Sequence, residues 1–156
     1  MRIYLPSTVS ELGAKGGLGP RVVHAVTAAL RAALPEEDEE GLEYAAQLLA
    51  ADASLERLDG APAGSRRRVV VAADVPEAVV ESIDADEDHA PSAVRLTTSI
   101  GWDDVACAHV DEIAAEPDIV AALAGDMEAA EHLAERDMLW YDVSELGRLA
   151  AKMARG

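Results

Sequence analysis

Several residue types are scarce or missing in this chain of 156 residues, and each absence excludes a class of protein. Cys107 is the only cysteine, so neither an intrachain disulfide nor a cysteine-based zinc site can form. No apolar run approaches the ~18 residues that a membrane helix needs. The opening run from Met1 to Pro6 also lacks the pattern of a signal peptide. We therefore expect a cytoplasmic protein that makes no membrane contact.

Positive charge is the second scarcity. The chain has 13 Lys plus Arg against 30 Asp plus Glu, which gives a net charge of -17. Proteins that bind DNA or RNA gain affinity by placing cations on phosphates, so this balance excludes general nucleic-acid binding. A protein partner is expected to be basic or to meet an apolar patch.

Phenylalanine is absent, whereas alanine occurs 32 times and arginine outnumbers lysine 11 to 2. A GC-rich genome accounts for these biases, and a salt-loving host is the alternative. Half of the residues are hydrophobic, which is enough to build a core. Length and composition together predict a single globular domain over residues 1–156.

Apolar alternation and continuous apolar runs predict the strands. They fall at residues 2–5, 21–27, 69–73, 93–98, 105–110 and 138–141. The run at 69–73 is typical of a central strand covered on both faces. Residues 21–34 fit a strand followed by a helix from about residue 28, although one continuous helix is the alternative.

Capping-box pairs predict helix starts after Thr8 and after Asp142. Pro35 and the acids behind it predict a helix that ends at Asp59-Gly60. Its expected apolar stripe is Tyr44, Leu48, Ala51, Leu55 and Leu58. A further helical segment begins at Pro117, and Gly125 can split it. Its expected stripe is Val120, Leu123, Met127, Ala130 and Ala134.

This order of elements predicts an α+β fold. We expect one mixed sheet of about five or six strands, with helices mainly on one face.

Complete catalytic motifs are missing. The glycine-rich stretch at 13–19 lacks the spacing of a phosphate-binding loop. The acidic stretch at 84–91 lacks the glycine and the final glutamate of a calcium loop, so we expect a solvated loop there. We identify no catalytic residue and expect no cofactor.

One constellation could carry chemistry. Cys107, His109 and Asp111 would share a face of the strand at 105–111, and His24 could join them from another strand. A small metal-binding protein or an enzyme that uses His24, His109 and Asp111 is therefore one hypothesis. The alternative is structural, with a core thiol, a hydrogen-bonded histidine and an aspartate that ends the strand.

The segment from Met138 to Tyr141 holds two of the five aromatic residues. Trp140 and Tyr141 are candidate partner-binding residues, because these types are enriched at interfaces. The alternative is that they fill the core. Arg66, Arg67 and Arg68 could bind a phosphate or pair with the chain's own acids.

Our leading hypothesis is a non-enzymatic binding or adaptor module whose partner is unknown, with a homodimer as one form. Another alternative is an acidic nucleic-acid mimic that presents the carboxylates at 36–43 to a basic partner.

Segments spread over nearly the whole chain resemble a family of short, acidic, uncharacterised proteins from actinobacteria. The matching segments are MRIYLP at 1–6, HAVT at 24–27, EEGLEYAA at 39–46, RRVVVAADVP at 67–76, AHVD at 108–111 and LWY at 139–141. The family is classed as a domain of unknown function. The resemblance favours the GC-rich explanation and implies no activity and no site residues.

Overall fold

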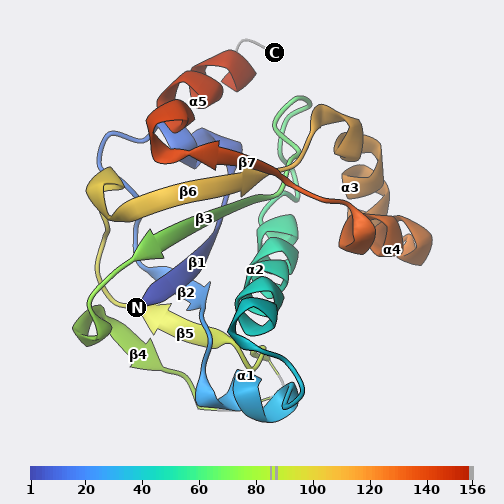
Figure 1. The fold of residues 1–156 in the computed structure, drawn as a ribbon. Helices are drawn as coiled ribbons and strands as arrows, with labels where there is room; N and C mark the ends of the chain where they lie inside the picture. The colour runs from blue at the N-terminus through green and yellow to red at the C-terminus, as the bar shows by residue number, and fades with distance from the viewer. Residues whose placement is uncertain (85, 87, 155–156) are drawn as a thin grey trace.

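The computed structural model describes residues 1–84, 86 and 88–154. These residues form one open sheet of seven strands in the order β4-β5-β2-β1-β3-β6-β7 (Figure 1). The strands are β1 (Arg2–Ser7), β2 (Arg21–His24), β3 (Val69–Asp74), β4 (Val80–Ser82), β5 (Ala93–Leu96), β6 (Val105–Val110) and β7 (Leu139–Asp142). The α+β class is confirmed, and the expectation of five or six strands was too low.

Every neighbouring pair in the sheet is antiparallel, so the expectation of a mixed sheet was wrong. The cause is the position of β1. The helices between β2 and β3 join two parallel strands, as in a βαβ unit. In this fold β1 lies between those two strands and pairs with both, antiparallel to each.

The strand β3 lies inside the sheet, next to the middle strand β1, and it pairs with β1 on one side and β6 on the other. Residues Val69 to Ala73 are at most 1% exposed, which confirms a central strand covered on both faces. Alternation along β1 is confirmed as well. Ile3 and Leu5 belong to one core cluster, while Tyr4 belongs to another on the opposite face.

Helices cover both faces of the sheet, and four of the five α-helices in the described chain lie on one side, in line with the expectation of helices mainly on one face. The long helix α2 (Glu39–Glu56) and the short helix α1 (Ala28–Ala33) cover the face that carries Tyr4, Val70 and Cys107. We call this face the α2 side. The 3-10 helix η1 (Val9–Gly13) and helix α5 (Leu146–Ala154) cover the opposite face, which we call the α5 side.

Helix α2 begins later and ends earlier than the sequence predicts. Residues after Pro35 form a turn, and Asp38 caps the helix by accepting a 2.8 Å hydrogen bond from the Gly41 amide. The last helical residue is Glu56, so the predicted end at Asp59-Gly60 was also wrong.

The predicted apolar stripe of α2 was wrong at its first two residues, although Ala51 and Leu58 of that stripe are buried. Tyr44 and Leu48 are exposed. The buried face carries Leu42, Ala46, Ala50, Ala51 and Ser54. Small side chains let the helix lie close to the sheet. There the hydroxyl of Ser54 donates to the Ser7 carbonyl at 2.8 Å and accepts from the Val69 amide at 2.9 Å.

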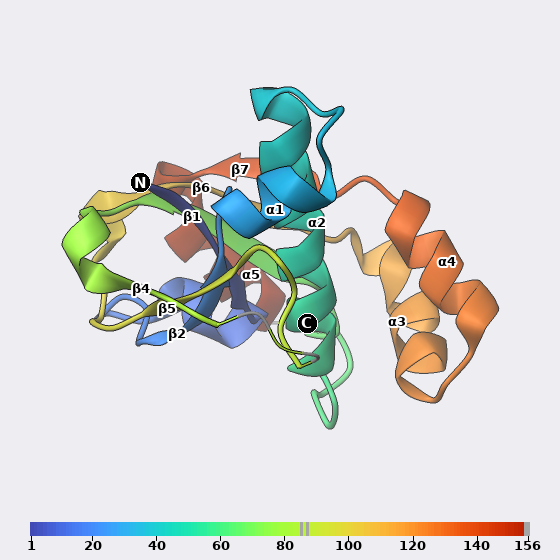
Figure 2. The ribbon, with the colours of Figure 1, turned by 90° about the horizontal axis from the view of Figure 1, so that it is seen from below.

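Helices α3 (Glu116–Leu123) and α4 (Met127–Glu135) form a separate pair, and α2 lies between them and the sheet (Figure 2). Gly125, with φ of +98°, separates the two helices as predicted. The predicted continuous stripe was wrong, because each helix turns its own face inward. Ile119 and Leu133 are buried, whereas Met127 is 78% exposed.

The other predicted helix starts are confirmed. In η1, the Thr8 amide donates to the Glu11 carboxylate at 3.1 Å. In α1, the Thr27 hydroxyl accepts from the Leu30 amide at 3.0 Å, so residues 21–34 form a strand and then a helix. The remaining 3-10 helices are η2 (Glu77–Val79), η3 (Trp102–Asp104), η4 (Ile113–Ala115) and η5 (Val143–Glu145).

Residues 85 and 87 of the predicted acidic loop lie outside the described residues. Within the described chain, every helix is too short or too polar to cross a membrane.

Candidate binding surfaces

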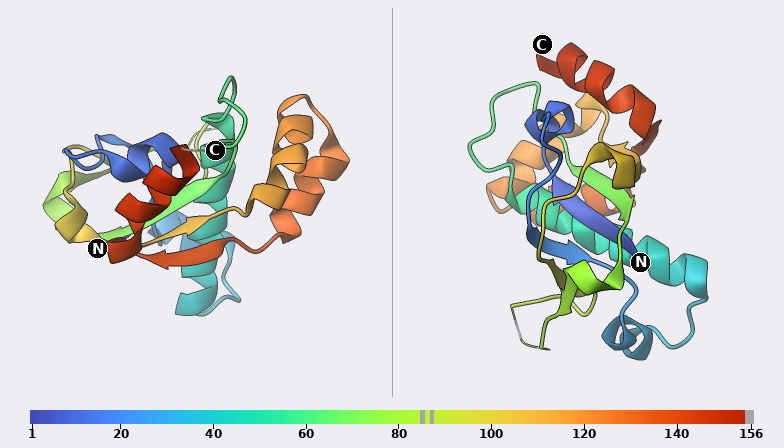
Figure 3. Two further views of the ribbon diagram at one scale, coloured as in Figure 1. Left: turned by 90° about the horizontal axis from the view of Figure 1, so that it is seen from above. Right: turned by 90° about the vertical axis from the view of Figure 1, so that its left-hand side faces the viewer.

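Trp140 lies in the middle of β7, the outermost strand at one end of the sheet. Figure 3 (left) looks onto this edge and shows α5 to one side of the strand. Trp140 is 59% exposed and Leu139 is 42% exposed. Tyr141 is partly buried and packs against the core cluster on the α5 side. The two candidate aromatic residues are therefore in different environments: Trp140 is at the surface, while Tyr141 borders the core.

The backbone of Trp140 faces outward. The Asp111 amide donates to the Arg68 carbonyl at 3.1 Å, so odd-numbered residues at this end of β6 face β3. In an antiparallel ladder successive residues alternate, so Val110 and Ala108 face β7. Their partners there are Leu139 and Tyr141. The N–H and C=O of Trp140 must then point to the open edge, where no strand of the described chain lies.

The β7 edge is less protected than the opposite edge of the sheet. Natural edges are shortened or carry charges and prolines that prevent pairing with another chain. The opposite edge, β4, has only three residues, and Glu81 within it is exposed. By contrast, β7 has four residues, and its one charge, Asp142, lies at its end, so the run from Met138 to Tyr141 contains neither a charge nor a proline.

A cleft of about 310 Å³ lies beside this strand on the α2 side. Its lining includes Tyr44 and Leu48 of α2 and His109 of β6, which stands opposite Trp140 in the ladder. Burial lowers the pKa of His109 below its usual value, so the imidazole is neutral near pH 7. Tyr44 and Leu48, the exposed residues of the predicted stripe, therefore line a cleft of mixed polarity that also includes Met138, which directly precedes β7.

The residues of the metal hypothesis are not brought together. His24 lies on β2 and His109 on β6, with β1 and β3 between them. Strands are ~4.8 Å apart, so about 14 Å separates the two backbones. Burial lowers the pKa of His24 to about 4, and a 2.7 Å hydrogen bond joins its Nδ1 to the hydroxyl of Ser92. Among the described residues, no group of three or more His, Cys, Asp or Glu side chains could hold a metal ion.

Asp111 takes part in a buried ion pair. Its carboxylate accepts from Nε and Nη2 of Arg68, at 2.7 and 2.9 Å, and from the Arg68 amide at 3.0 Å. The two side chains are 0% and 4% exposed. Cys107 is also buried, and burial raises the pKa of its thiol. Asp111 and Cys107 are therefore buried parts of the sheet, the first in an ion pair and the second in a core cluster.

The basic cluster at 66–68 and the acidic run at 36–43 both form contacts within the chain. Arg66 donates from Nε to the Ala61 carbonyl at 2.8 Å, and its amide donates to Glu116 at 2.9 Å. Arg67 has a buried Nε with no hydrogen-bond partner in the part of the chain that the structure describes. Of the acids at 36–43, Asp38 caps α2 and Glu39 forms an ion pair with Arg31.

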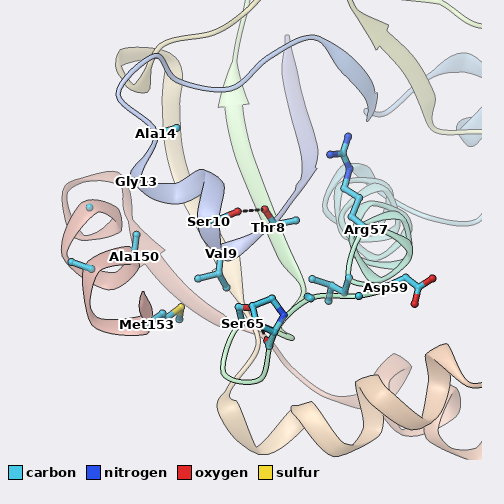
Figure 4. A pocket seen from close by; sticks show the side chains of 16 residues that line it. Thr8, Val9, Ser10, Gly13, Ala14, Arg57, Asp59, Ser65, Ala150 and Met153 are labelled. Carbon is cyan, nitrogen blue, oxygen red and sulfur yellow. Dashed lines mark hydrogen bonds between the residues drawn. The ribbon is translucent and has the colours of Figure 1, made fainter. Parts of the chain in front are cut away.

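A cavity of about 780 Å³ lies on the α5 side (Figure 4). It opens between η1, α5 and the loop that follows α2. Its apolar lining includes Val9, Leu58 and Met153, all buried. Apart from Val9 and Met153, the lining residues from η1 and α5 and the turn after η1 are small: Ser10, Gly13, Ala14, Gly147, Ala150 and Ala151.

Polar groups are few around this cavity. The hydroxyls of Thr8 and Ser10 lie 3.1 Å apart in a hydrogen bond, and Ser65 donates to the Pro62 carbonyl at 2.7 Å. Arg57 and Asp59 come from the end of α2, and their charged groups point in different directions (Figure 4). The sequence analysis missed this cavity. The available signal was the small residues 147, 150 and 151, where an amphipathic helix usually carries larger apolar side chains.

Residues 1–150 match a family of unknown function, DUF6912, and the chain therefore belongs to that family. This confirms the resemblance to a domain of unknown function. No curated protein and no solved structure matches the chain. The family assigns no activity, so function must be argued from the surfaces described above.

Proposed function

We propose that this protein is a non-enzymatic cytoplasmic binding module that associates with a second copy of itself through β7. The observation that carries the proposal is Trp140, which is 59% exposed on an edge strand whose one charged residue, Asp142, is its last. An exposed edge is a template for pairing with another strand, and aromatic residues are enriched among interface residues that dominate binding.

The geometry of β7 selects one register. If two copies pair antiparallel about a two-fold axis, residues opposite each other must lie on the same face of the joined sheet. Trp140 is on the α2 side, so it can face Trp140 of the second copy. Leu139 then faces Tyr141 on the α5 side. Because the N–H and C=O of Trp140 point outward, the two tryptophans exchange both backbone hydrogen bonds.

The register also avoids charge. Asp142, the acidic residue within β7, would stand opposite Met138 of the second copy. The net charge of -17 on each copy opposes association over longer distances. Such repulsion is screened beyond roughly 8 Å at physiological ionic strength. We therefore expect a weak dimer, in the micromolar range, that becomes stronger as salt is added.

The two other hypotheses have less support. The metal-binding or enzyme hypothesis would need His24 and His109 to act on one ion or substrate, although two strands, β1 and β3, lie between them. The acids at 36–43 are partly engaged within the chain, by the cap at Asp38 and the ion pair of Glu39 with Arg31. A complex of these acids with a basic partner would weaken in salt, whereas the β7 dimer would strengthen.

Sedimentation equilibrium of the wild-type chain and of two variants tests the proposal. Trp140→Ala should weaken dimerisation at least about tenfold, the scale of a central aromatic residue in an interface. Met127→Ala removes another exposed apolar side chain, on α4, and should leave dimerisation unchanged. Urea unfolding of each variant establishes that it remains folded.

Two outcomes would contradict the proposal. One is a wild-type chain that stays monomeric at millimolar concentration in 0.5 M salt (roughly a 4 Å Debye length). The other is a dimer that Trp140→Ala leaves intact, which would place the interface elsewhere. Tyr141→Ala is not a clean test, because Tyr141 packs against the core and its loss should destabilise the fold.

A further inference from the structure

The cavity on the α5 side has the dimensions and lining of a ligand site. Ligand pockets usually measure about 300–1,000 Å³ and are mostly apolar with a few polar groups. The cavity of about 780 Å³ falls within this range, and buried Val9, Leu58 and Met153 contribute to its lining. Leu146 and Met153 hold α5 against the core, while Gly147 and Ala151 leave the space beside it open.

The cavity also has a cation without an ion-pair partner. Arg57 contributes to its lining and also to that of a second cleft on the α2 side, and it makes no salt bridge within the described residues. The carboxylate of Asp59, which also lines the cavity, points away from Arg57 (Figure 4). The neighbouring carboxylate of Glu11 is already engaged, because Arg21 donates to its two oxygens at 3.1 and 2.7 Å. In a chain with 30 acidic residues, an unpaired guanidinium beside an apolar cavity favours an external anion.

We infer that this cavity binds a single-chain amphiphile with an anionic end, such as a long-chain carboxylate. The apolar chain would lie between η1, α5 and the loop after α2. The carboxylate would pair with Arg57 at the end of α2. This inference is independent of the proposed dimer, because the cavity lies on the α5 side and Trp140 lies on the α2 side.

Binding of dodecanoate and of dodecanol, measured by isothermal titration below the concentration at which either aggregates, tests both parts of the inference. The two probes share one chain and differ in charge. The wild-type chain should bind dodecanoate about tenfold tighter than dodecanol, the scale of one charge-assisted hydrogen-bonded contact. Arg57→Gln should abolish this preference and leave dodecanol binding unchanged.

Gly147→Leu tests the location. A Cβ at Gly147 meets no atom within 4 Å, so the leucine can enter the cavity without a backbone clash. Glycine is also a weak helix former, so α5 should gain stability. We expect dodecanoate and dodecanol to bind at least about tenfold more weakly while the melting temperature does not fall. Ala151→Leu, at another exposed lining position, should have the same effect on binding.

Three results would overturn the inference. The first is no saturable binding of either probe to the wild-type chain. The second is binding that both filling variants leave unchanged, which would place the site elsewhere. The third is a preference for dodecanoate that persists in Arg57→Gln, which would remove the assigned role of Arg57.

Discussion

The ion pair between Arg68 and Asp111 offers the strongest test of how the sheet is stabilised. Asp111→Ala would leave the guanidinium of Arg68 buried without its partner, since the two side chains are 4% and 0% exposed. It would also remove the acceptor of the Arg68 amide, which now donates to Asp111 at 3.0 Å. Breaking one side of a buried pair typically costs about 3–5 kcal/mol.

That cost is large compared with the total stability of a domain, which is typically about 5–15 kcal/mol. For a chain of this size it corresponds to a fall in melting temperature of roughly 8–16 °C. Urea unfolding followed by circular dichroism measures the loss directly, because the midpoint shifts while the slope stays constant.

The exposed pair of Arg2 and Asp74 is a matched control. It has the same two-bonded geometry, at 2.8 and 2.9 Å, but its side chains are 39% and 59% exposed. Asp74→Ala should therefore cost only about 0–1 kcal/mol. The double variant Arg68→Met with Asp111→Leu should recover much of the loss, because it leaves no unpaired charge. Equal costs for Asp111→Ala and Asp74→Ala would refute the reasoning from burial.

Two further predictions concern His24 and Gly17. Because burial lowers the folded-state pKa of His24 to about 4, the unfolded chain binds the extra proton first, and stability is lost as pH falls from 6.5 towards 4. When the pH is lowered from 7.5 to 4, the free energy of unfolding measured in urea should fall by about 3 kcal/mol more in the wild type than in His24→Asn. Equal falls in the two proteins would contradict a buried neutral imidazole. Gly17 has φ of +81°, and a Cβ there would lie 1.9 Å from the Ile100 carbonyl oxygen. Gly60 is the control, because its φ is +80° but the space around it is open, and Gly60→Ala should cost ~1–2 kcal/mol. Gly17→Ala should cost well over that amount. Similar falls in melting temperature for the two variants would argue against the clash.

Local patterns predicted the local structure well. The continuous run at β3, the alternation along β1 and the capping residues Thr8 and Asp142 each depend on neighbouring residues only. Gly125 separated two helices because its φ of +98° suits glycine. Such features are determined by sequence neighbours, so one sequence suffices to find them.

Features that depend on distant segments were not predictable in this way. Hydrophobicity ranked Tyr44 and Leu48 above Ala46 and Ala50, yet close packing against the sheet favours the smaller residues. The antiparallel sheet follows from the insertion of β1 between β2 and β3, which no local pattern reports. The cavity arises where three separate segments, 8–14, 57–65 and 147–153, meet and carry mostly small side chains, so it is visible only in three dimensions.

The candidate partner residues illustrate the same limit. Trp140 and Tyr141 are adjacent and have similar character, and the sequence placed both either at an interface or in the core. In the structure they lie on opposite faces of an edge strand, so Trp140 is exposed and Tyr141 packs against the core.

Amide hydrogen exchange at Trp140, followed by NMR over a range of protein concentrations, tests the proposed dimer most directly. The N–H of Trp140 points to the open edge, so its exchange should slow as concentration rises and the second copy supplies an acceptor. The amides of Leu139 and Tyr141 already face β6 and should change little. Exchange at Trp140 that stays fast and independent of concentration would contradict pairing through β7.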